Sequence, residues 1–534
     1  MTFAKTRISG LAVLLIAAGL LFTACDIGSF GDINEDPTEA TEVDAELLVS
    51  RSIAYGTLRY DVYQRSQHLF GNLYSQYFSN LAPSFPTGRY ETVPPYDDWA
   101  TSFWSATYAA FGGGNNVGEN VSNAGVNIQL AIDQTQDDPQ KANITAQARI
   151  WKVYLMHRIT DNWGDVPYTE AFAGLKGNTT PSYEEQEAIY RDMLSTLETA
   201  VSNLDPSITG DRFRLGSADL LFNDDLTKWR RFGNSLRLRL AMRAAEAAPT
   251  LAEQHVNDVL TTGEVMQGNS DSARRPTTTG GDFVTQNPIG VITNFDDDRV
   301  SATMVDVLQE RNDPRLSVYA DTIGSFEILQ DTMAFRGLPN GLSAGDISGI
   351  QSFKYSALGP RLRAADFSVP VLLYAEVKFL EAEAALRGWG PGTAQAHYED
   401  GIRASLDMYG VTDPQTQQDY LQEPGVAWNA GGTGAEQLEQ IITQKWIATF
   451  TQGFQAWAEY RRTGYPDLQP LAIDDAQTET GGAVPSRLQY VNIEQATNTQ
   501  NVNAASQRIG GNSLTTDVWW DQEQSNLVTS DGSE

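Results

Sequence analysis

Apolar positions recur at helical spacing through most of the chain. In the range 140–161, Ile144, Ala148, Trp151, Leu155 and Ile159 fall on one side of a predicted helix. The same spacing predicts further helices at 45–81, 99–111, 182–204, 225–240, 370–388, 393–409, 435–450 and 453–463. Several of these are consecutive pairs separated by glycine or proline, which is typical of helical hairpins.

Residues that cap helices define some of the predicted boundaries. Ser182 and Glu185 have the spacing of a capping box, and Asp225 is the expected N-cap of the next helix. Strand-like runs are confined to 283–293 and 326–336. The long polar stretches, expected to be loops, are 263–300, 337–366 and 464–534. The predicted fold class is therefore mostly α, with tetratricopeptide-like helix pairs and a long loop-rich insertion region.

The first 25 residues have the pattern of an export signal. Lys5 and Arg7 precede an apolar run, 11–22, that is too short to span a membrane but has the length of a signal-peptide core. Small residues then precede Cys25, as in a bacterial lipobox. One interpretation is a lipoprotein signal whose removal leaves a lipidated Cys25. The other is an ordinary cleavable signal followed by a chance cysteine.

The lipoprotein interpretation gives the predicted organisation of the chain. A signal peptide covers 1–24, a lipidated N-terminus and flexible tether cover 25–45, and one helical domain covers 46–534. Lipid on Cys25 would hold this domain at a membrane.

The charge balance narrows the classes of partner. The chain has 534 residues, with 68 acidic and 37 basic side chains and a formal net charge of −31. Such a chain repels phosphate backbones, so we expect no nucleic-acid partner. Only 8 of the basic residues are lysine, and this acidic, lysine-poor composition suggests the hypothesis of a high-salt habitat.

Metal, cofactor and catalytic signals are weak. A single cysteine excludes Cys-based zinc or iron–sulfur sites, and the four histidines show no ligand spacing, so we predict no cofactor. The contiguous acids 296–298 could offer oxygen to calcium, but they lack the alternate spacing and glycine turn of a metal loop. A solvated loop is the favoured interpretation, and calcium binding stays open.

The acidic residues Glu376, Glu381 and Glu383 raise an alternative, a two-carboxylate hydrolase. Glu376 and Glu383 are seven residues apart on a predicted helix and so share a face. A structural role is favoured, because Arg461 and Arg462 could pair with Glu381 or Glu383 and hold two helices together. No catalytic residue is predicted.

The best ligand candidates are loop aromatics, because sugar rings and apolar peptide side chains both dock on exposed aromatic planes. The loop-like stretch 85–99 offers Tyr90, Tyr96 and Trp99 as platforms, with Arg89 and Asp98 as polar partners. For Trp99, packing in the core of the following helix is an equally good interpretation.

Nine stretches in a fixed order carry a resemblance to a known family. They are NEDP at 34–37, DNWGDVPYTEA at 161–171, FGNSLRLRLA at 232–241, DPRL at 313–316, AEVKFLEAEAA at 375–385, QKWI at 444–447, WAEYRRTGYP at 457–466, PSRL at 485–488 and VWWD at 518–521. Together they resemble the SusD/RagB family of outer-membrane nutrient-binding lipoproteins, in its SusD-like subgroup.

The resemblance implies a non-enzymatic protein, lipid-anchored in the outer membrane and facing outward. It would cap a SusC-like TonB-dependent outer-membrane transporter and pass to it an oligosaccharide or peptide ligand. Two other interpretations remain: a lipid-anchored polysaccharide hydrolase, and a purely structural surface lipoprotein with no ligand.

Overall fold

The computed structural model describes residues 43–91, 99–108, 123–280, 285–323, 335–471 and 479–522. The chain divides into two units, 1–44 and 45–534. The predictions for the signal peptide, for Cys25 and for most of the tether lie outside the described residues. Within them, no helix has both the length and the apolar character that crossing a bilayer requires.

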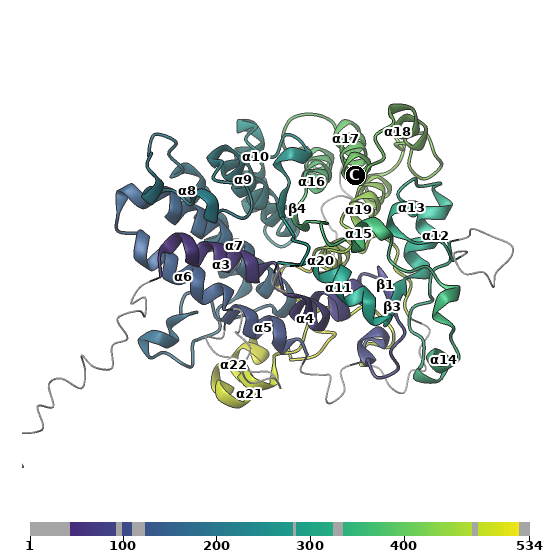
Figure 1. Cartoon of the computed structure of the whole chain (residues 1–534), viewed down its shortest axis with the longest axis horizontal. Coiled ribbons are helices and arrows are strands. Elements are labelled where there is room, and N and C mark those ends of the chain that lie inside the picture. Colours follow the sequence, from purple (N-terminus) through teal and green to yellow (C-terminus); the bar gives the residue numbers. More distant parts are fainter. Residues whose placement is uncertain are drawn as a thin grey trace, which may run out of the picture. The chain divides into compact units, whose positions relative to one another are not determined.

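Helices dominate the second unit, as predicted (Figure 1). In the N-terminal half, each helix from α6 to α10 packs against the next one in the sequence, and α3 packs against α6. These helices are α3 (Ala45–Gly56), α6 (Ala124–Thr135), α7 (Ala142–Trp163), α8 (Gln186–Ser202), α9 (Leu226–Arg243) and α10 (Pro249–Thr262). The predicted arrangement of consecutive helix pairs is confirmed in this half.

A second set of helices lies toward the C-terminus. It comprises α16 (Tyr374–Leu386), α17 (Ala394–Met408), α19 (Gly434–Ala448) and α20 (Gly453–Thr463). Helix α16 packs against α17 and α19, while contacts of α16 with α9 and of α20 with α7 join the two sets. Helices from both halves therefore share one core.

Short helices fill the connections. The short α-helices are α4 (Tyr60–Tyr63), α5 (Thr101–Tyr108), α11 (Pro288–Ile292), α12 (Ala302–Glu310), α13 (Leu316–Tyr319), α14 (Ala344–Ser348), α15 (Pro360–Arg363), α18 (Pro414–Tyr420), α21 (Asn492–Thr497) and α22 (Thr499–Arg508). A π-helix, η1 (Gln64–Asn72), follows α4. The 3-10 turns are η2 (Pro86–Arg89), η3 (Pro139–Lys141), η4 (Ala173–Lys176), η5 (Asp211–Phe213), η6 (Gly216–Ala218), η7 (Asn269–Asp271), η8 (Thr293–Phe295) and η10 (Ser352–Lys354).

The strands form two small antiparallel sheets. Strand β1 (Phe78–Asn80) pairs with β3 (Asp298–Val300), and β2 (Ala273–Arg275) pairs with β4 (Val369–Leu372). The strand prediction for 283–293 is wrong, because α11 occupies the second half of that run. In the run 326–336 only its last two residues are described, and they form no strand. Strands of three or four residues are too short for the alternation that sequence patterns detect.

Two predicted helix starts had different outcomes. Asp225 does cap α9, since its carboxylate accepts hydrogen bonds from the backbone N–H groups of Thr227 and Lys228. The capping box at Ser182 is wrong, because α8 begins at Gln186 and Ser182 instead donates to Glu170 at 2.8 and 2.9 Å. The backbone N–H of Gln186 is satisfied by Asp165, which lies 21 residues earlier.

The backbones of η1 and α20 meet at two glycines. A Cβ atom added to Gly453 would lie 2.1 Å from the backbone nitrogen of Asn72, and one added to Gly71 would lie 2.6 Å from that of Phe454. No side chain fits at either position, so this contact brings an N-terminal helix directly onto a C-terminal one.

Candidate functional site

A cluster of buried charged side chains joins α7, α9, α16 and α20. We call Asp161, Arg243, Glu383, Glu459 and Arg462 the ion-pair cluster. Arg243 donates to Asp161 at 3.0 Å and to Glu459 at 2.8 Å. Arg462 donates to Glu459 at 2.7 Å and to both oxygens of Glu383 at 2.7 Å. Burial alone would raise the pKa of Glu459, but the surrounding cations hold it well below its usual range.

The three carboxylates of the hydrolase alternative are held in ion pairs. Glu376 is fully buried and accepts two hydrogen bonds, of 2.7 and 2.8 Å, from Arg239. Glu383 belongs to the ion-pair cluster, and Glu381 lies 2.6 Å from the Lys378 ammonium. Because these groups serve helix packing rather than an open surface, they offer no site for a polymer substrate.

The two arginines predicted to pair with these glutamates behave differently. The pairing of Arg462 with Glu383 is confirmed. The same prediction is wrong for Arg461, which donates to the backbone oxygens of Asp161 and Ser486. The guanidinium carbon of Arg461 lies 3.8 Å from the ring centroid of Trp457 and 4.7 Å from that of Trp520.

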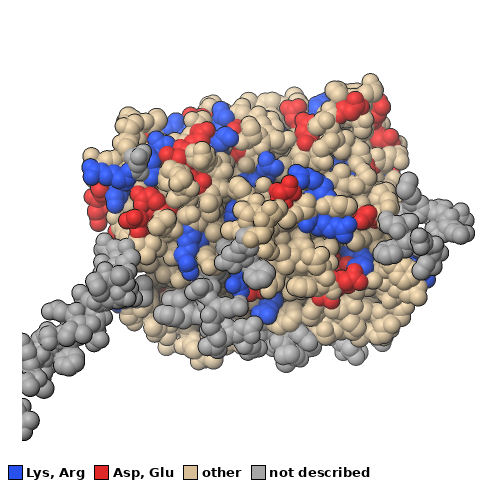
Figure 2. Space-filling view, in the orientation of Figure 1, with Lys and Arg blue, Asp and Glu red and all other residues tan. Residues whose placement is uncertain are grey.

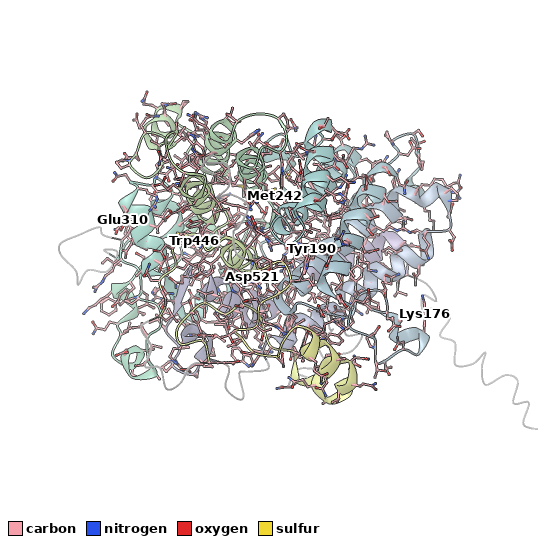
Figure 3. The ribbon with its side chains drawn as sticks, turned by 180° about the vertical axis from the view of Figure 1, so that it is seen from behind. Lys176, Tyr190, Met242, Glu310, Trp446 and Asp521 are labelled. Atoms are coloured by element: carbon pink, nitrogen blue, oxygen red, sulfur yellow. The ribbon has the colours of Figure 1, made fainter. Side chains whose placement is uncertain are left out.

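Sequence reasoning missed the central role of Asp161. Besides Arg243, its carboxylate accepts hydrogen bonds from Tyr190, from the Trp520 indole at 3.1 Å and from His157 Nδ1 at 3.1 Å. The labels in Figure 3 place Tyr190 and Asp521 near the middle of the view. The only sequence signal was that Asp161 and Trp520 both fall in family-matching stretches.

The predicted ligand loop is only partly described. We call Phe85, Arg89 and Trp99 the aromatic surface. Trp99 is half-buried, its ring centroid lies 5.0 Å from that of Phe85, and the Arg65 guanidinium lies 5.9 Å from the Trp99 ring. Arg89 is also half-buried and donates to Glu91 at 3.0 and 3.2 Å. A charged group and an aromatic face therefore lie on one short segment.

Tyr90 does not present an exposed ring, and that expectation is wrong. Its side chain is 1% exposed, and its ring stands edge-on to Tyr74 with the centroids 5.4 Å apart. The hydroxyl accepts a hydrogen bond from Gln76, and burial raises the pKa of this phenol. The chain turns at a left-handed φ of 58° there, which directs the ring into the core. Tyr96 and Asp98 lie outside the described residues.

Residues that are distant in sequence from 85–99 lie next to the aromatic surface. A small hollow beside Phe85 and Arg89 is lined on its other side by Gly341, Leu342 and Ile347. On the face drawn in Figure 2, acidic and basic side chains gather over α8 and α9. No pattern in the sequence indicated that 341–347 would come close to 85–89.

The acids at 296–298 do not form a solvated loop throughout. Asp298 is buried in β3, and its carboxylate lies 2.9 Å from His68 Nε2. Asp296 pairs with Arg299 at 2.6 Å and accepts a hydrogen bond from Ser352. In the described part of the chain, no group of three or more His, Cys, Asp or Glu residues is arranged to hold a metal ion.

The described residues form a mostly helical domain, and comparison with known sequences gives its family. The chain matches a family model, SusD-like, described as starch-binding and associating with the outer membrane, over residues 37–491. The protein therefore belongs to the SusD-like family, whose members associate with the outer membrane. The family and the mostly α, tetratricopeptide-like fold predicted from the sequence are confirmed. Among curated proteins, no sequence matches the chain.

Solved structures of similar proteins agree with this assignment. A chitin-binding protein is 30% identical with a TM-score of 0.74, and the alignment covers 89% of this chain and 99% of that one. A chitin-binding SusD homologue from Flavobacterium johnsoniae is 28% identical, with a TM-score of 0.71 and coverage of 90% and 99%. A SusD homologue from Bacteroides vulgatus is 26% identical, with a TM-score of 0.75 and coverage of 89% and 98%.

Proposed function

We propose that this protein is an outward-facing outer-membrane lipoprotein, anchored through Cys25, that captures an oligosaccharide or peptide nutrient. It delivers this ligand to a SusC-like TonB-dependent transporter and performs no chemistry on it. The observation that carries the proposal is the family match over residues 37–491. The chitin-binding relatives favour a glycan as the ligand.

The proposed binding residues are Arg89 and Trp99, with Tyr96 and Asp98 on the same loop. A sugar ring would place its apolar C–H face on the Trp99 indole, while Arg89 would donate hydrogen bonds to ring hydroxyls. Arg89 is fixed by Glu91, so little conformational entropy is lost when it binds.

Two experiments test the proposal separately. For the anchor and the partner, a C-terminally tagged protein is extracted gently from native outer membrane and analysed by mass spectrometry. We expect diacylglycerol on Cys25 and a large β-barrel protein in stoichiometric amount. A protein that lacks lipid and elutes alone would contradict the anchor and the transporter partner.

For ligand binding, a glycan array that includes chito-oligosaccharides identifies the ligand, and calorimetry measures its affinity. Trp99→Ala is expected to weaken binding about tenfold, because the stacking plane is lost. Trp428→Ala is the matched control, since Trp428 is half-buried against a different hydrophobic cluster with Tyr398. Equal affinity in the Trp99→Ala variant would exclude the aromatic surface as the site.

A further inference from the structure

A cleft of about 360 Å³ lies between α6, α7 and α8 and shares no residue with the aromatic surface. The three helices pack side by side in Figure 1. Polar side chains dominate the wall of the cleft. Those that carry the argument are Gln129 from α6, Arg149 and Lys152 from α7, and Asp192, Ser195 and Thr196 from α8. The volume falls in the range of small-molecule sites.

Within the described residues, two cations in this cleft make no ion pair with a carboxylate. Arg149 and Lys152 are three residues apart on α7 and so share a face. In the described part of the chain, the one hydrogen bond of the Lys152 ammonium goes to the neutral oxygen of Gln129, at 2.8 Å. Arg149 makes no hydrogen bond or ion pair with any described residue. Burial lowers the pKa of Lys152, the carboxylates of Asp192 and Asp133 partly offset this, and Arg149 lowers the pKa further.

The two acids with the largest electrostatic effect on Lys152 also interact with other groups. Asp192 accepts a 2.7 Å hydrogen bond from the Tyr168 hydroxyl, and Asp133 lies 2.9 Å from the ammonium of Lys176. Lys176, labelled in Figure 3, lies at the margin of the domain. Asp192, which lines the same cleft, and Asp133 compensate the charge of Lys152 in part. Arg149 adds a second positive charge on the same face of α7, and like charges at this spacing destabilise a helix.

We infer that this cleft binds an acidic sugar unit, a hexuronic acid, through its carboxylate. Arg149 and Lys152 supply charge-assisted donors to the carboxylate. Ser195, Thr196 and Gln129 offer both donors and acceptors, as vicinal sugar hydroxyls require. The site is separate from the aromatic surface and does not depend on the role proposed for that surface.

Calorimetry and saturation-transfer NMR with the full domain test the inference. The probes are galacturonate, galactose and N-acetylglycine, which separate the acidic sugar from the neutral sugar and from a carboxylate without a sugar ring. We expect galacturonate to bind at least about tenfold more tightly than either comparison ligand. Its affinity should fall when salt rises from about 50 mM to about 500 mM, because the interaction is ionic.

The variants Arg149→Gln and Lys152→Met are each expected to weaken galacturonate binding about tenfold or more. Arg191→Gln is the matched control, since Arg191 pairs with Glu187 on the exposed face of α8. Thermal melts confirm that each variant is folded. Galactose binding as tight as galacturonate, N-acetylglycine binding as tight as galacturonate, no binding at all, or equal affinity in the cleft variants would each overturn the inference.

Discussion

Arg462 holds Glu383 through two hydrogen bonds of 2.7 Å, and neither side chain is exposed to solvent. The two residues lie on α20 and α16 and are 79 residues apart in sequence, so the pair connects two distant helices. A bidentate ion pair of this kind fixes the relative orientation of the two side chains as well as the distance between them. Loss of this ion pair is expected to lower the stability of the whole core rather than of one helix.

Glu383→Gln should destabilise the domain by about 3 to 5 kcal/mol, because the substitution leaves buried guanidinium charge poorly compensated. Denaturant unfolding of the soluble domain measures this loss. Glu187→Gln, in an exposed pair with Arg191, is the control and should cost less than about 1 kcal/mol. A Glu383→Gln variant as stable as this control would show that the buried pair contributes little.

Acid should destabilise the protein partly through His157. Burial lowers the pKa of this imidazole from 6.5 to about 4, although Asp161 opposes the shift. Between these two pH values the unfolded chain binds a proton that the folded chain does not, so stability falls as pH decreases from about 6.5 to about 4. The expected contribution is about 3 kcal/mol.

His157→Gln should reduce the loss of stability with decreasing pH, measured by urea unfolding at a series of pH values. In the unsubstituted protein, the ring signals of His157 should stay those of a neutral imidazole down to a pH of about 5. Ring signals that titrate near the ordinary value would contradict the prediction.

The contribution of Asp521 to stability should change with pH in the opposite direction to that of His157. Burial and the nearby Asp517 raise its pKa from 3.8 to about 7, and Arg461 only partly offsets this. The folded chain therefore binds a proton more tightly than the unfolded one, and this group's contribution to stability falls as pH rises from about 4 to about 7. Asp521→Asn should stabilise the domain at pH 8 by about 1 to 3 kcal/mol and have little effect at pH 4. Unfolding curves at both values measure this, and Asp517→Asn, which removes the nearby charge, should give a smaller change of the same sign.

Because the backbones of η1 and α20 are in direct contact, we expect that a methyl group cannot be accommodated at Gly453. Gly453→Ala should destabilise the domain by about 3 kcal/mol or more, because the added Cβ meets backbone atoms that cannot move independently. The matched control is Gly174→Ala, where no atom lies within 4 Å of the added Cβ. Thermal melting of both variants separates steric overlap from a general effect of replacing glycine.

Salt should stabilise this protein. With a formal net charge of −31, repulsion among surface carboxylates opposes the compact state and is screened by ions. The melting temperature is expected to rise between about 50 mM and about 2 M sodium chloride. A melting temperature that is no higher at the upper concentration would remove the support for a high-salt habitat.

The regular helices were predictable because their apolar stripes repeat over several turns. The ranges 140–161, 435–450 and 453–463 correspond within a few residues to α7, α19 and α20. The strands were not predictable, because strands of three or four residues are too short to show a periodic pattern. The start of α8 was also missed, since its cap comes from Asp165 and depends on the folded chain.

The site was predictable only in part. Arg89 and Trp99 lie half-buried on the described part of the predicted loop, whereas Tyr90 turns inward at its left-handed backbone position. The meeting of Asp161 with Trp520 could not be read from spacing, because 359 residues separate them. The sequence also held no sign that Arg149 and Lys152 would make no ion pair with a described acidic residue.

The hydrogen bond from Trp520 to Asp161 has a consequence for the order of folding. Trp520 lies 359 residues after Asp161, so a growing polypeptide cannot complete the hydrogen bonds of Asp161 until this later segment has been made. Contacts this distant in sequence form slowly. The region around Asp161 therefore stays incompletely folded during much of the chain's synthesis.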